Sequence, residues 1–319
     1  MTLDNQRGAP PESQPLVAIL MCTYNGAAFL AEQLQSIIDQ TYDRWFLVVS
    51  DDGSTDATLR LLEEHRSRLG DRLTIRRGPG RGFAENFMSL ACDSGIDADY
   101  FAFADQDDVW HANKLAHSLS TLQRAEATGQ PALYCGRCRL VDEQGHYLGL
   151  SPLFSRRPSF RNALVQSLAG ANTMLLNAQA RSLLTKLPTE AHVIAHDWLA
   201  YLLVTAYSGP VIYDAQPALD YRQHAHNVIG ANTKLSARYK RLGMLLQGRF
   251  RKWSQANLSI LEQLQPPLNQ KDAEALRWFK QSHGTRGLKG LWALWRSGVY
   301  RQTLVGQCSL LLGAFLGKI

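Results

Sequence analysis

Three carboxylates, those of Asp105, Asp107 and Asp108, follow directly after the apolar run at residues 100–103. A strand that ends in acids places negative charge at a sheet edge, where the ligands of open α/β sheets bind. Carboxylates this close repel one another, so we expect a cation between them, and Mg²⁺ and Mn²⁺ prefer carboxylate oxygens and often bind phosphates too. The cluster predicts a site for a divalent cation and a phosphorylated ligand, although a solvated acidic turn would have the same sequence.

A second acidic run makes the solvated turn the weaker explanation. Asp51 and Asp52 follow the apolar run at residues 46–49. The carboxyl ends of parallel strands meet at one edge of a sheet, so both acidic runs are expected to face one crevice. Asp52 could instead cap the next helix, but Ser54 and Asp56 are predicted to supply that N-cap. We therefore interpret Asp51 and Asp52 as ligand-binding residues.

The polar residues after the first apolar run are a third candidate. Thr23, Tyr24 and Asn25 follow residues 17–21. Hydrogen-bonding groups and an aromatic ring at the end of a strand could contact a nucleobase, although Asn25 could also belong to a simple turn. The glycine-rich run at residues 78–82 predicts a turn between a strand and a helix.

Apolar periodicity places these runs in alternating strands and helices. In the first part of the chain, strands are predicted at residues 17–21, 45–49, 73–75 and 100–104, and helices at residues 29–38, near residues 59–62, from residue 86 and at residues 113–127. After residue 131 the pattern is mixed, with strands near residues 132–141, 173–176 and 211–213 and helices near residues 178–185 and 197–207. Repeated β-α units predict an α/β fold with a mainly parallel, Rossmann-like sheet flanked by helices.

Five blocks of this sequence, read in order, resemble the signature set of the family 2 glycosyltransferases. They are residues 17–25, 48–56, 104–110, 195–198 and 219–230. The last two blocks resemble a subgroup rich in bacterial surface-polysaccharide rhamnosyltransferases. The resemblance covers residues 15–232. It implies the GT-A fold of nucleotide-diphospho-sugar transferases, an inverting reaction, and a Mg²⁺ or Mn²⁺ cofactor at an acidic motif of the D-x-D type.

The resemblance also implies roles for individual residues. It makes Asp52 the acceptor of a pyrimidine N3–H, which suits a UDP- or dTDP-linked donor. It assigns Asp107 to the metal ion and Asp105 to the metal ion or the ribose, and it places Asn86 near the donor. It makes Asp197 the catalytic base, which is chemically adequate because proton removal can be late, as the leaving group departs. A carboxylate at a helix N-terminus is also favoured by the helix dipole, so simple capping is the alternative for Asp197.

Arg222, His224 and His226 stand close together in the last block. A single histidine is usually structural, whereas an arginine with two histidines after a strand suits an anion or a metal ion. The resemblance implies that this segment closes over the diphosphate of the donor. We expect Arg222 to contact the donor and His224 to contribute to the metal site.

The composition allows one large α/β domain with an appendage. The chain has 319 residues, of which 45% are hydrophobic, and a formal net charge of +6. Residues 1–15 contain no apolar signal segment and are expected to be a disordered lead-in, residues 16–232 the catalytic domain, and residues 233–319 a basic helical region. Five scattered cysteines argue against a disulfide framework, and Cys135 and Cys138, an isolated C-x-x-C pair, are interpreted as ordinary thiols.

The C-terminal region is basic and amphipathic. Residues 234–253 contain seven Lys or Arg and no Asp or Glu, with apolar residues at three-to-four spacing. Trp292 and Trp295 follow, and then the uncharged run at residues 303–317, which is shorter than the ~20 residues that span a bilayer. These features fit a peripheral anchor on an anionic membrane surface. The alternative is ordinary helical packing on the catalytic domain, and no nucleic-acid-binding motif accompanies the charge.

We therefore expect an inverting, metal-dependent glycosyltransferase at the cytoplasmic, inner face of a bacterial plasma membrane. It would move a sugar, with rhamnose from dTDP-rhamnose suggested by the subgroup, to a glycan or polyprenyl-diphosphate-linked acceptor in O-antigen, capsule or exopolysaccharide synthesis. A nucleotidyltransferase is one alternative, but it would want a glycine-rich basic loop early in the chain, and residues 22–25 are not one. A non-catalytic membrane-surface binding protein with a GT-A-like sheet is the other, and it would not need Asp52, Asp107 and Asp197 intact.

Overall fold

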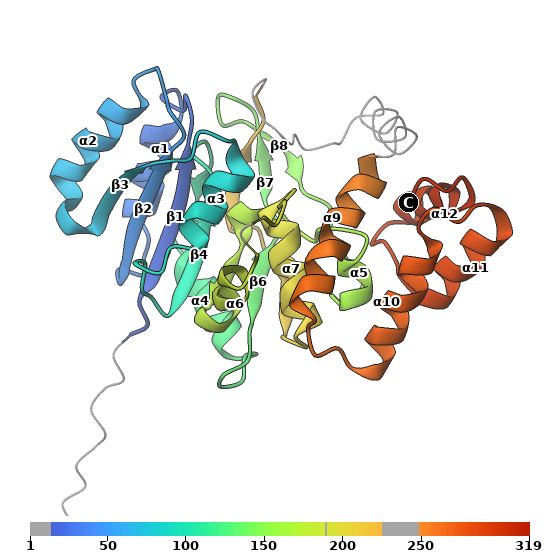
Figure 1. The fold of residues 1–319 in the computed structure, drawn as a ribbon. Coiled ribbons are helices and arrows are strands. Elements are labelled where there is room, and N and C mark those ends of the chain that lie inside the picture. Colours follow the sequence, from blue (N-terminus) through green and yellow to red (C-terminus); the bar gives the residue numbers. More distant parts are fainter. Residues whose placement is uncertain (1–13, 189, 225–248) are drawn as a thin grey trace, which may run out of the picture.

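The computed structural model describes residues 14–188, 190–224 and 249–319 of the chain. A large sheet with helices on both faces occupies one side of the molecule, and helices from the C-terminal part occupy the other side (Figure 1). A smaller sheet lies along one edge of the first. The candidate site lies where the two sheets meet.

The large sheet has seven strands in the order β10-β6-β9-β4-β1-β2-β3. They are β1 (Val17–Thr23), β2 (Trp45–Asp51), β3 (Leu73–Arg77), β4 (Tyr100–Ala104), β6 (Leu133–Gly136), β9 (Leu175–Asn177) and β10 (Val211–Asp214). Strand β9 runs antiparallel to its neighbours β4 and β6, and the other neighbouring pairs are parallel. The expected mainly parallel sheet is confirmed, and the carboxyl ends of β1, β2 and β4 lie at one edge.

Both faces of this sheet are buried under helices. In β1, Ala18 and Leu20 belong to one hydrophobic cluster, whereas Val17, Ile19 and Met21 belong to the other, because successive side chains of a strand point to opposite faces. The first cluster is completed by α3 (Phe83–Ala91), α6 (Ala178–Thr185) and α7 (His196–Ala206), and the second by α1 (Leu30–Ile38), α2 (Thr58–Leu69) and α4 (Lys114–Gln123). Burial on both faces explains why the strands read as continuous apolar runs.

A four-stranded sheet in the order β5-β11-β7-β8 lies beside the end of β4. Its strands are β5 (Val109–Trp110), β7 (Arg139–Val141), β8 (Tyr147–Leu150) and β11 (Leu219–Arg222). Strand β5 follows Asp108 directly, and β11 pairs antiparallel with it through Leu219 and Trp110. The small sheet therefore carries Arg222 and the residues after it to the acidic run that follows β4.

The single strand expected near residues 132–141 is wrong, because the chain divides it between the two sheets. Strand β6 pairs in the large sheet and β7 in the small one. Between them, the Nε atom of Arg137 donates a hydrogen bond to the Ser151 carbonyl at 2.8 Å. Residues 132–135 are all apolar, and apolar residues resume at Cys138 after Gly136 and Arg137, so the sequence reads as one interrupted apolar run.

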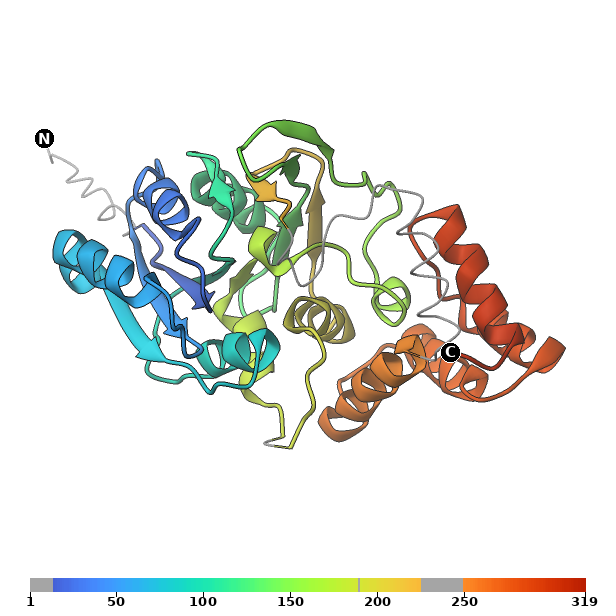
Figure 2. The same cartoon turned by 90° about the horizontal axis from the view of Figure 1, so that it is seen from above.

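The C-terminal helices share the first hydrophobic cluster with the sheet. They are α9 (Arg249–Leu264), α10 (Gln270–Ser282), α11 (Gly287–Ser297) and α12 (Leu304–Phe315), and they lie beside α7 and the short helix α5 (Phe160–Ala163) (Figure 2). Phe250 stacks on Trp198 with ring centroids 6.3 Å apart, and Phe279 and Leu294 are buried in the same cluster. The basic helix expected at residues 234–253 falls largely outside the described residues. Among the described helices, none combines the length and the apolar character needed to cross a bilayer.

Candidate active site

The acidic loop, residues 105–108, follows β4 and is braced against the loop that follows β1. The side-chain amide of Gln106 forms two hydrogen bonds with the backbone of Tyr24. Its Nε2 donates to the Tyr24 carbonyl at 3.1 Å, and its Oε1 accepts from the Tyr24 N–H at 2.9 Å. The Nε2 of Gln33 in α1 donates to the Asp105 carbonyl at 3.0 Å. These bonds hold the carboxylates of the acidic loop next to the polar end of β1.

Asp51 organises the loop that follows β2. Its Oδ2 accepts hydrogen bonds from the hydroxyls of Thr23 (2.8 Å) and Ser54 (2.5 Å). Its Oδ1 accepts from the N–H groups of Gly53 and Ser54, at 3.1 and 2.8 Å. Asp51 and Thr23 are both buried. Both residues, predicted to contact a donor, therefore join the ends of β1 and β2.

The predicted N-cap of α2 is wrong for Ser54, and only Asp56 contacts the start of the helix. The Ser54 hydroxyl donates to Asp51, and the N-cap position of α2 is Ala57, with no side-chain cap hydrogen bond. Asp56 does accept from the N–H of Thr58, the first helical residue, at 2.9 Å. Asp52, for which capping was the alternative role, makes no such contact.

Asp52 instead holds the glycine-rich loop at residues 78–82. Its Oδ1 accepts from the Gly80 N–H at 2.6 Å and its Oδ2 from the Gly82 N–H at 2.8 Å. A Cβ atom on Gly78 would lie 2.7 Å from Asp52 Oδ1, so glycine is needed for the approach. A carboxylate offers about four lone-pair positions, so Asp52 retains acceptor capacity for a ligand.

The other residues predicted to touch a donor divide into exposed and buried ones. The Tyr24 side chain is 59% exposed. Asn25 has a left-handed φ of 47°, and its Oδ1 accepts from the Thr55 N–H at 2.8 Å, so it braces the next loop. Asn86 is buried, and its Nδ2 donates to the Ser50 carbonyl at 3.0 Å, while its Oδ1 has no hydrogen-bond partner among the described residues.

Strand β11 brings Arg222 and His224 to the acidic loop. The Nε2 of His224 lies 2.7 Å from Asp107 Oδ2. The Nε of buried Arg222 donates to the Asp107 carbonyl at 3.2 Å, and its guanidinium pairs with the Glu32 carboxylate. The Phe29 ring lies 4.8 Å from the Arg222 guanidinium carbon and 5.0 Å from the His224 ring. The last block and the acidic loop thus meet as the sequence predicted.

The acidic loop concentrates negative charge in a partly buried place. Burial, together with the negative charges of Asp107 and Asp197, raises the pKa of Asp105 to about 7. Burial also raises the pKa of Asp108, again helped by Asp105 and Asp107. Asp108 is fully buried, and its Oδ2 accepts from the Asn172 side-chain amide at 2.6 Å. Repulsion of this kind favours either protonation or a nearby cation.

Asp197 lies in the first turn of α7 and reaches the same charge cluster. The N-cap of α7 is Ala195, which makes no side-chain cap hydrogen bond. Burial raises the pKa of Asp197 to about 6, while hydrogen bonds from the Trp198 N–H and the Ser167 hydroxyl oppose the rise. Ser167 Oγ lies 3.2 Å from Asp197 Oδ2. A carboxylate with a pKa near the working pH has the properties of a general base.

Acids at the ends of neighbouring strands, with a further carboxylate across from them, form the arrangement that the five sequence blocks imply. A family model described as Glycosyl transferase family 2 matches residues 18–176, the part of the chain that contains β1, β2, β4 and the acidic loop. The chain is a family 2 glycosyltransferase.

Sequence relatives of this glycosyltransferase include two bacterial sugar transferases. It is 29% identical over 242 residues to the dTDP-rhamnosyl transferase RfbG of Shigella flexneri, covering 73% of this chain and 81% of that protein. It is 38% identical over 108 residues to the UDP-Glc:alpha-D-GlcNAc-diphosphoundecaprenol beta-1,3-glucosyltransferase WfgD of Escherichia coli, covering 34% of this chain and 41% of that protein.

Solved glycosyltransferase structures have the same fold. S. aureus TarS in complex with UDP-GlcNAc superposes with a TM-score of 0.53 at 13% identity, covering 94% of this chain and 89% of that chain. Mannosyltransferase PcManGT from Pyrobaculum calidifontis, in complex with GDP-Man and Mn2+, superposes with a TM-score of 0.53 at 17% identity, covering 90% and 74%. These likenesses confirm the predicted GT-A fold.

The residues of this glycosyltransferase fit a divalent cation in part. Asp107 and His224 already contact each other. The buried carboxylate of Asp105 would be stabilised by a positive charge beside it. Oxygen ligands with one imidazole suit Mn²⁺ or Mg²⁺. Within the residues that the structure describes, no three His, Cys, Asp or Glu side chains are yet gathered into a complete ligand set. His226 lies outside the described residues.

Sequence reasoning missed three residues that shape the site of this glycosyltransferase. Neither Gln106 nor Ser167 was predicted to belong to the site, yet each forms a hydrogen bond with a site residue. His196 is fully buried, stacks on Phe87 with ring centroids 4.3 Å apart, and is kept neutral because burial lowers its pKa to about 3. The sequence near Gln106 and Ser167 gives no indication of their partners, Tyr24 and Asp197, which lie 82 and 30 positions away.

Gly26 should prove essential to the brace between the two loops. A Cβ atom there would lie 2.2 Å from Gln106 Oε1, so Gly26→Ala should expel the Gln106 amide and break both of its bonds to Tyr24. We expect a stability loss of about 1–2 kcal/mol in urea unfolding, together with a higher KM for the donor. If the clash is the cause, adding Gly26→Ala to Gln106→Ala should cost little more, whereas fully additive losses would contradict the brace.

Proposed function

We propose that this family 2 glycosyltransferase is an inverting enzyme that moves a sugar from a nucleoside diphosphate donor to a glycan or polyprenyl-diphosphate-linked acceptor of a bacterial surface polysaccharide. The observation that carries the proposal is the meeting of Asp105, Asp107 and Asp197 at the carboxyl edge of the sheet, close enough for their charges to interact. A leaving diphosphate needs positive charge beside it, and an acceptor hydroxyl needs a base. The acids of this edge can hold a cation that provides the positive charge, and Asp197 can act as the base.

The proposed donor is dTDP-rhamnose. Its support is the likeness to the dTDP-rhamnosyl transferase RfbG, which extends over most of both chains. Asp52 would accept the N3–H of thymine, as its spare lone pairs allow, and the exposed Tyr24 ring would lie against the base. Thr23, Asn25 and Asp51 would act on the donor indirectly, by holding these two loops.

The proposed reaction is a single displacement. The acceptor hydroxyl gives its proton to Asp197, and its oxygen forms a bond to the anomeric carbon. The bond from that carbon to the diphosphate oxygen breaks, and its electron pair leaves on the phosphate. A metal ion held by Asp107, Asp105 and His224 would supply charge neutralisation for the leaving diphosphate. Arg222 would fix the acidic loop through the Asp107 carbonyl, and its guanidinium would add positive charge near the donor.

The proposed place of work is the cytoplasmic, inner face of the plasma membrane, where lipid-linked acceptors are presented. We keep the division at residue 232 as a functional one, with donor chemistry in residues 16–232 and membrane contact in residues 233–319. It is not a division between two separate cores, because α9 and α10 bury Phe250 and Phe279 with the sheet. The basic character of the C-terminal region supports attraction to anionic lipid.

A donor screen with Mn²⁺ or Mg²⁺ tests this function. We expect dTDP-rhamnose to raise the melting temperature and to be turned over, with release of dTDP and transfer of labelled rhamnose to a polyprenyl-diphosphate-linked acceptor. A different sugar donor would correct the proposed specificity alone. Pyrophosphate release from a nucleoside triphosphate and a sugar phosphate would instead indicate a nucleotidyltransferase. Lack of turnover with every donor and acceptor would favour the other alternative, a non-catalytic membrane-surface binding protein.

A further inference from the structure

Two C-terminal helices leave a concentrated set of large apolar side chains in solvent. On α11, Leu288, Trp292 and Trp295 are 78%, 51% and 73% exposed and follow one another at helical spacing. On α12 and its C-cap residue, the exposed large apolar residues are Leu304, Val305, Leu311, Leu312, Phe315 and Leu316. We call these nine side chains the apolar surface. They are nine of the sixteen exposed large apolar side chains in the described chain, which is too uneven to be ordinary scatter.

Positive charge accompanies the apolar surface. Between Arg286 and Ile319 there are five Lys or Arg and no Asp or Glu. Arg286, Lys289 and Arg296 are exposed on or next to α11, beside its leucine and tryptophans. A basic apolar helix face rich in tryptophan matches the boundary between the headgroups and acyl chains of an anionic bilayer.

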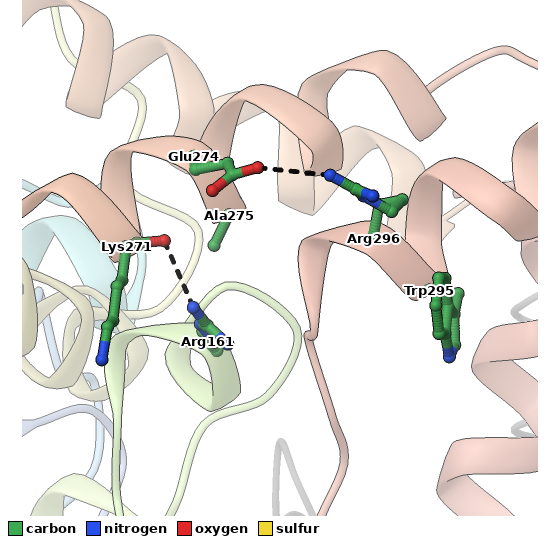
Figure 3. Close-up of a pocket in the computed structure, with 6 residues that line it drawn as sticks. All are labelled: Arg161, Lys271, Glu274, Ala275, Trp295 and Arg296. Carbon is green, nitrogen blue, oxygen red and sulfur yellow. Dashed lines mark hydrogen bonds and ion pairs between the residues drawn. The ribbon is translucent and has the colours of Figure 1, made fainter.

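A basic hollow opens at the edge of α11, between α10 and α5. Its volume is about 260 Å³, and Figure 3 shows its lining residues, Arg161, Lys271, Glu274, Ala275, Trp295 and Arg296. Arg161 is fixed there by a hydrogen bond to the Lys271 carbonyl at 3.3 Å. Arg296 lies 3.5 Å from Glu274, and Trp295 belongs to both the hollow and the apolar surface. Arg161 also lies 3.7 Å from the Asp272 carboxylate, which is outside the lining, and Arg296 faces Glu274. Lys271 is the third cation of the lining and leaves net positive charge for a phosphate group.

We propose that the exposed sides of α11 and α12 dock on a bilayer of anionic phospholipid, with the basic hollow receiving a headgroup phosphate. The inference rests on the membrane location proposed above and names the surface responsible. Helix α12 has 12 residues, too few to span, but it can lie in the plane of the interface. A second copy of the chain is a poorer occupant, because a two-fold contact would place this basic surface against itself.

Co-sedimentation of the full-length protein with vesicles tests the surface. The vesicles contain phosphatidylcholine alone or with an equal amount of phosphatidylglycerol. We expect Trp295→Ser with Leu304→Ser to weaken binding to the anionic vesicles by about tenfold or more. Lys271→Gln with Arg296→Gln should weaken it by about tenfold at low salt and by much less at high salt.

Matched controls remove similar groups elsewhere. Tyr147→Ser with Leu148→Ser takes two apolar side chains of 60% and 58% exposure from β8, and Arg60→Gln with Arg66→Gln takes two charges from α2. Both controls should bind vesicles as the unmodified protein does. Equal losses in the controls and the test variants, or no loss in the test variants, would overturn the proposal.

Further outcomes separate this surface from other roles. If the protein sediments as a dimer that Trp295→Ser with Leu304→Ser converts to monomer, a second copy covers the surface and the proposal is wrong. If the Lys271 and Arg296 pair of substitutions impairs transfer to a lipid-linked acceptor in detergent, the hollow binds acceptor phosphate instead of a headgroup. Hydrolysis of the sugar donor in solution should be unchanged in all these variants, so failure of the docking surface is distinguishable from failure of the proposed reaction.

Discussion

Replacing Asp197 with asparagine should lower kcat by about 10²–10⁴-fold while leaving donor affinity nearly unchanged. The amide keeps the shape of the side chain and can still accept from the Ser167 hydroxyl, so packing around α7 should survive. What it loses is the site that takes the acceptor proton. Steady-state kinetics together with donor titration by calorimetry measure the two effects separately. Near-normal turnover would mark Asp197 as a residue that only stabilises the helix end.

The pH profile supplies a second test of the same base. Burial raises the pKa of Asp197 to about 6, so kcat should fall as the pH drops through that value and the carboxylate becomes protonated. The Ser167 hydrogen bond lowers this pKa, so Ser167→Ala should move the acidic limb of the profile to higher pH. A limb that stays in place in this variant would argue that another group limits the rate.

Replacing Asp107 with alanine should abolish transfer and remove the stabilisation of the protein by donor plus Mn²⁺. The variant loses a carboxylate proposed to hold the metal ion and the partner of His224. Its own fold should not suffer, because the charge of Asp107 raises the pKa values of Asp105 and Asp108 and its removal relieves that repulsion. Thermal unfolding with and without donor and metal, alongside a transfer assay, measures each part.

A carboxylate elsewhere on the surface provides the control for Asp107. Asp71 is exposed in the turn before β3, and Asp71→Asn should retain full activity and the full metal-dependent shift in melting temperature. EDTA should inhibit the unmodified protein and this control alike. Unchanged turnover of the unmodified protein in EDTA would refute a catalytic metal ion at the acidic loop.

The parts of the fold that the sequence predicted are those set by local pattern. Residues 17–21 alternate between two apolar faces, and the structure buries both. The break near Arg137 escaped prediction because apolar residues stand on both sides of Gly136 and Arg137, and nothing local shows that the two parts pair in different sheets. The role of Ser54 was misjudged because a hydroxyl before a helix can cap it or bind a nearer carboxylate, and here Asp51 competes successfully.

For the candidate site, sequence order predicted which groups gather but not how they are held. Strand ends at Asp51 and Ala104 fixed the edge at which the acids meet. The supports of that edge join residues far apart, as Arg222 does with Glu32 at a separation of 190 positions. Such contacts depend on how β11 and α1 pack against each other across the edge. A single sequence carries no local signal for them.

The cluster shared by Phe250 and Trp198 has a consequence for engineering new specificities. Trp198 is the neighbour of Asp197 in α7, and α9 covers it. Consider a chimera joined at residue 232 that carries the C-terminal helices of another enzyme. In it, α7, the helix with the proposed base Asp197, would pack against a helix that does not match Trp198. Recombination would have to exchange α5, α7 and α9 to α12 as a unit, and the donor-binding loops of β1, β2 and β4 could then be grafted independently.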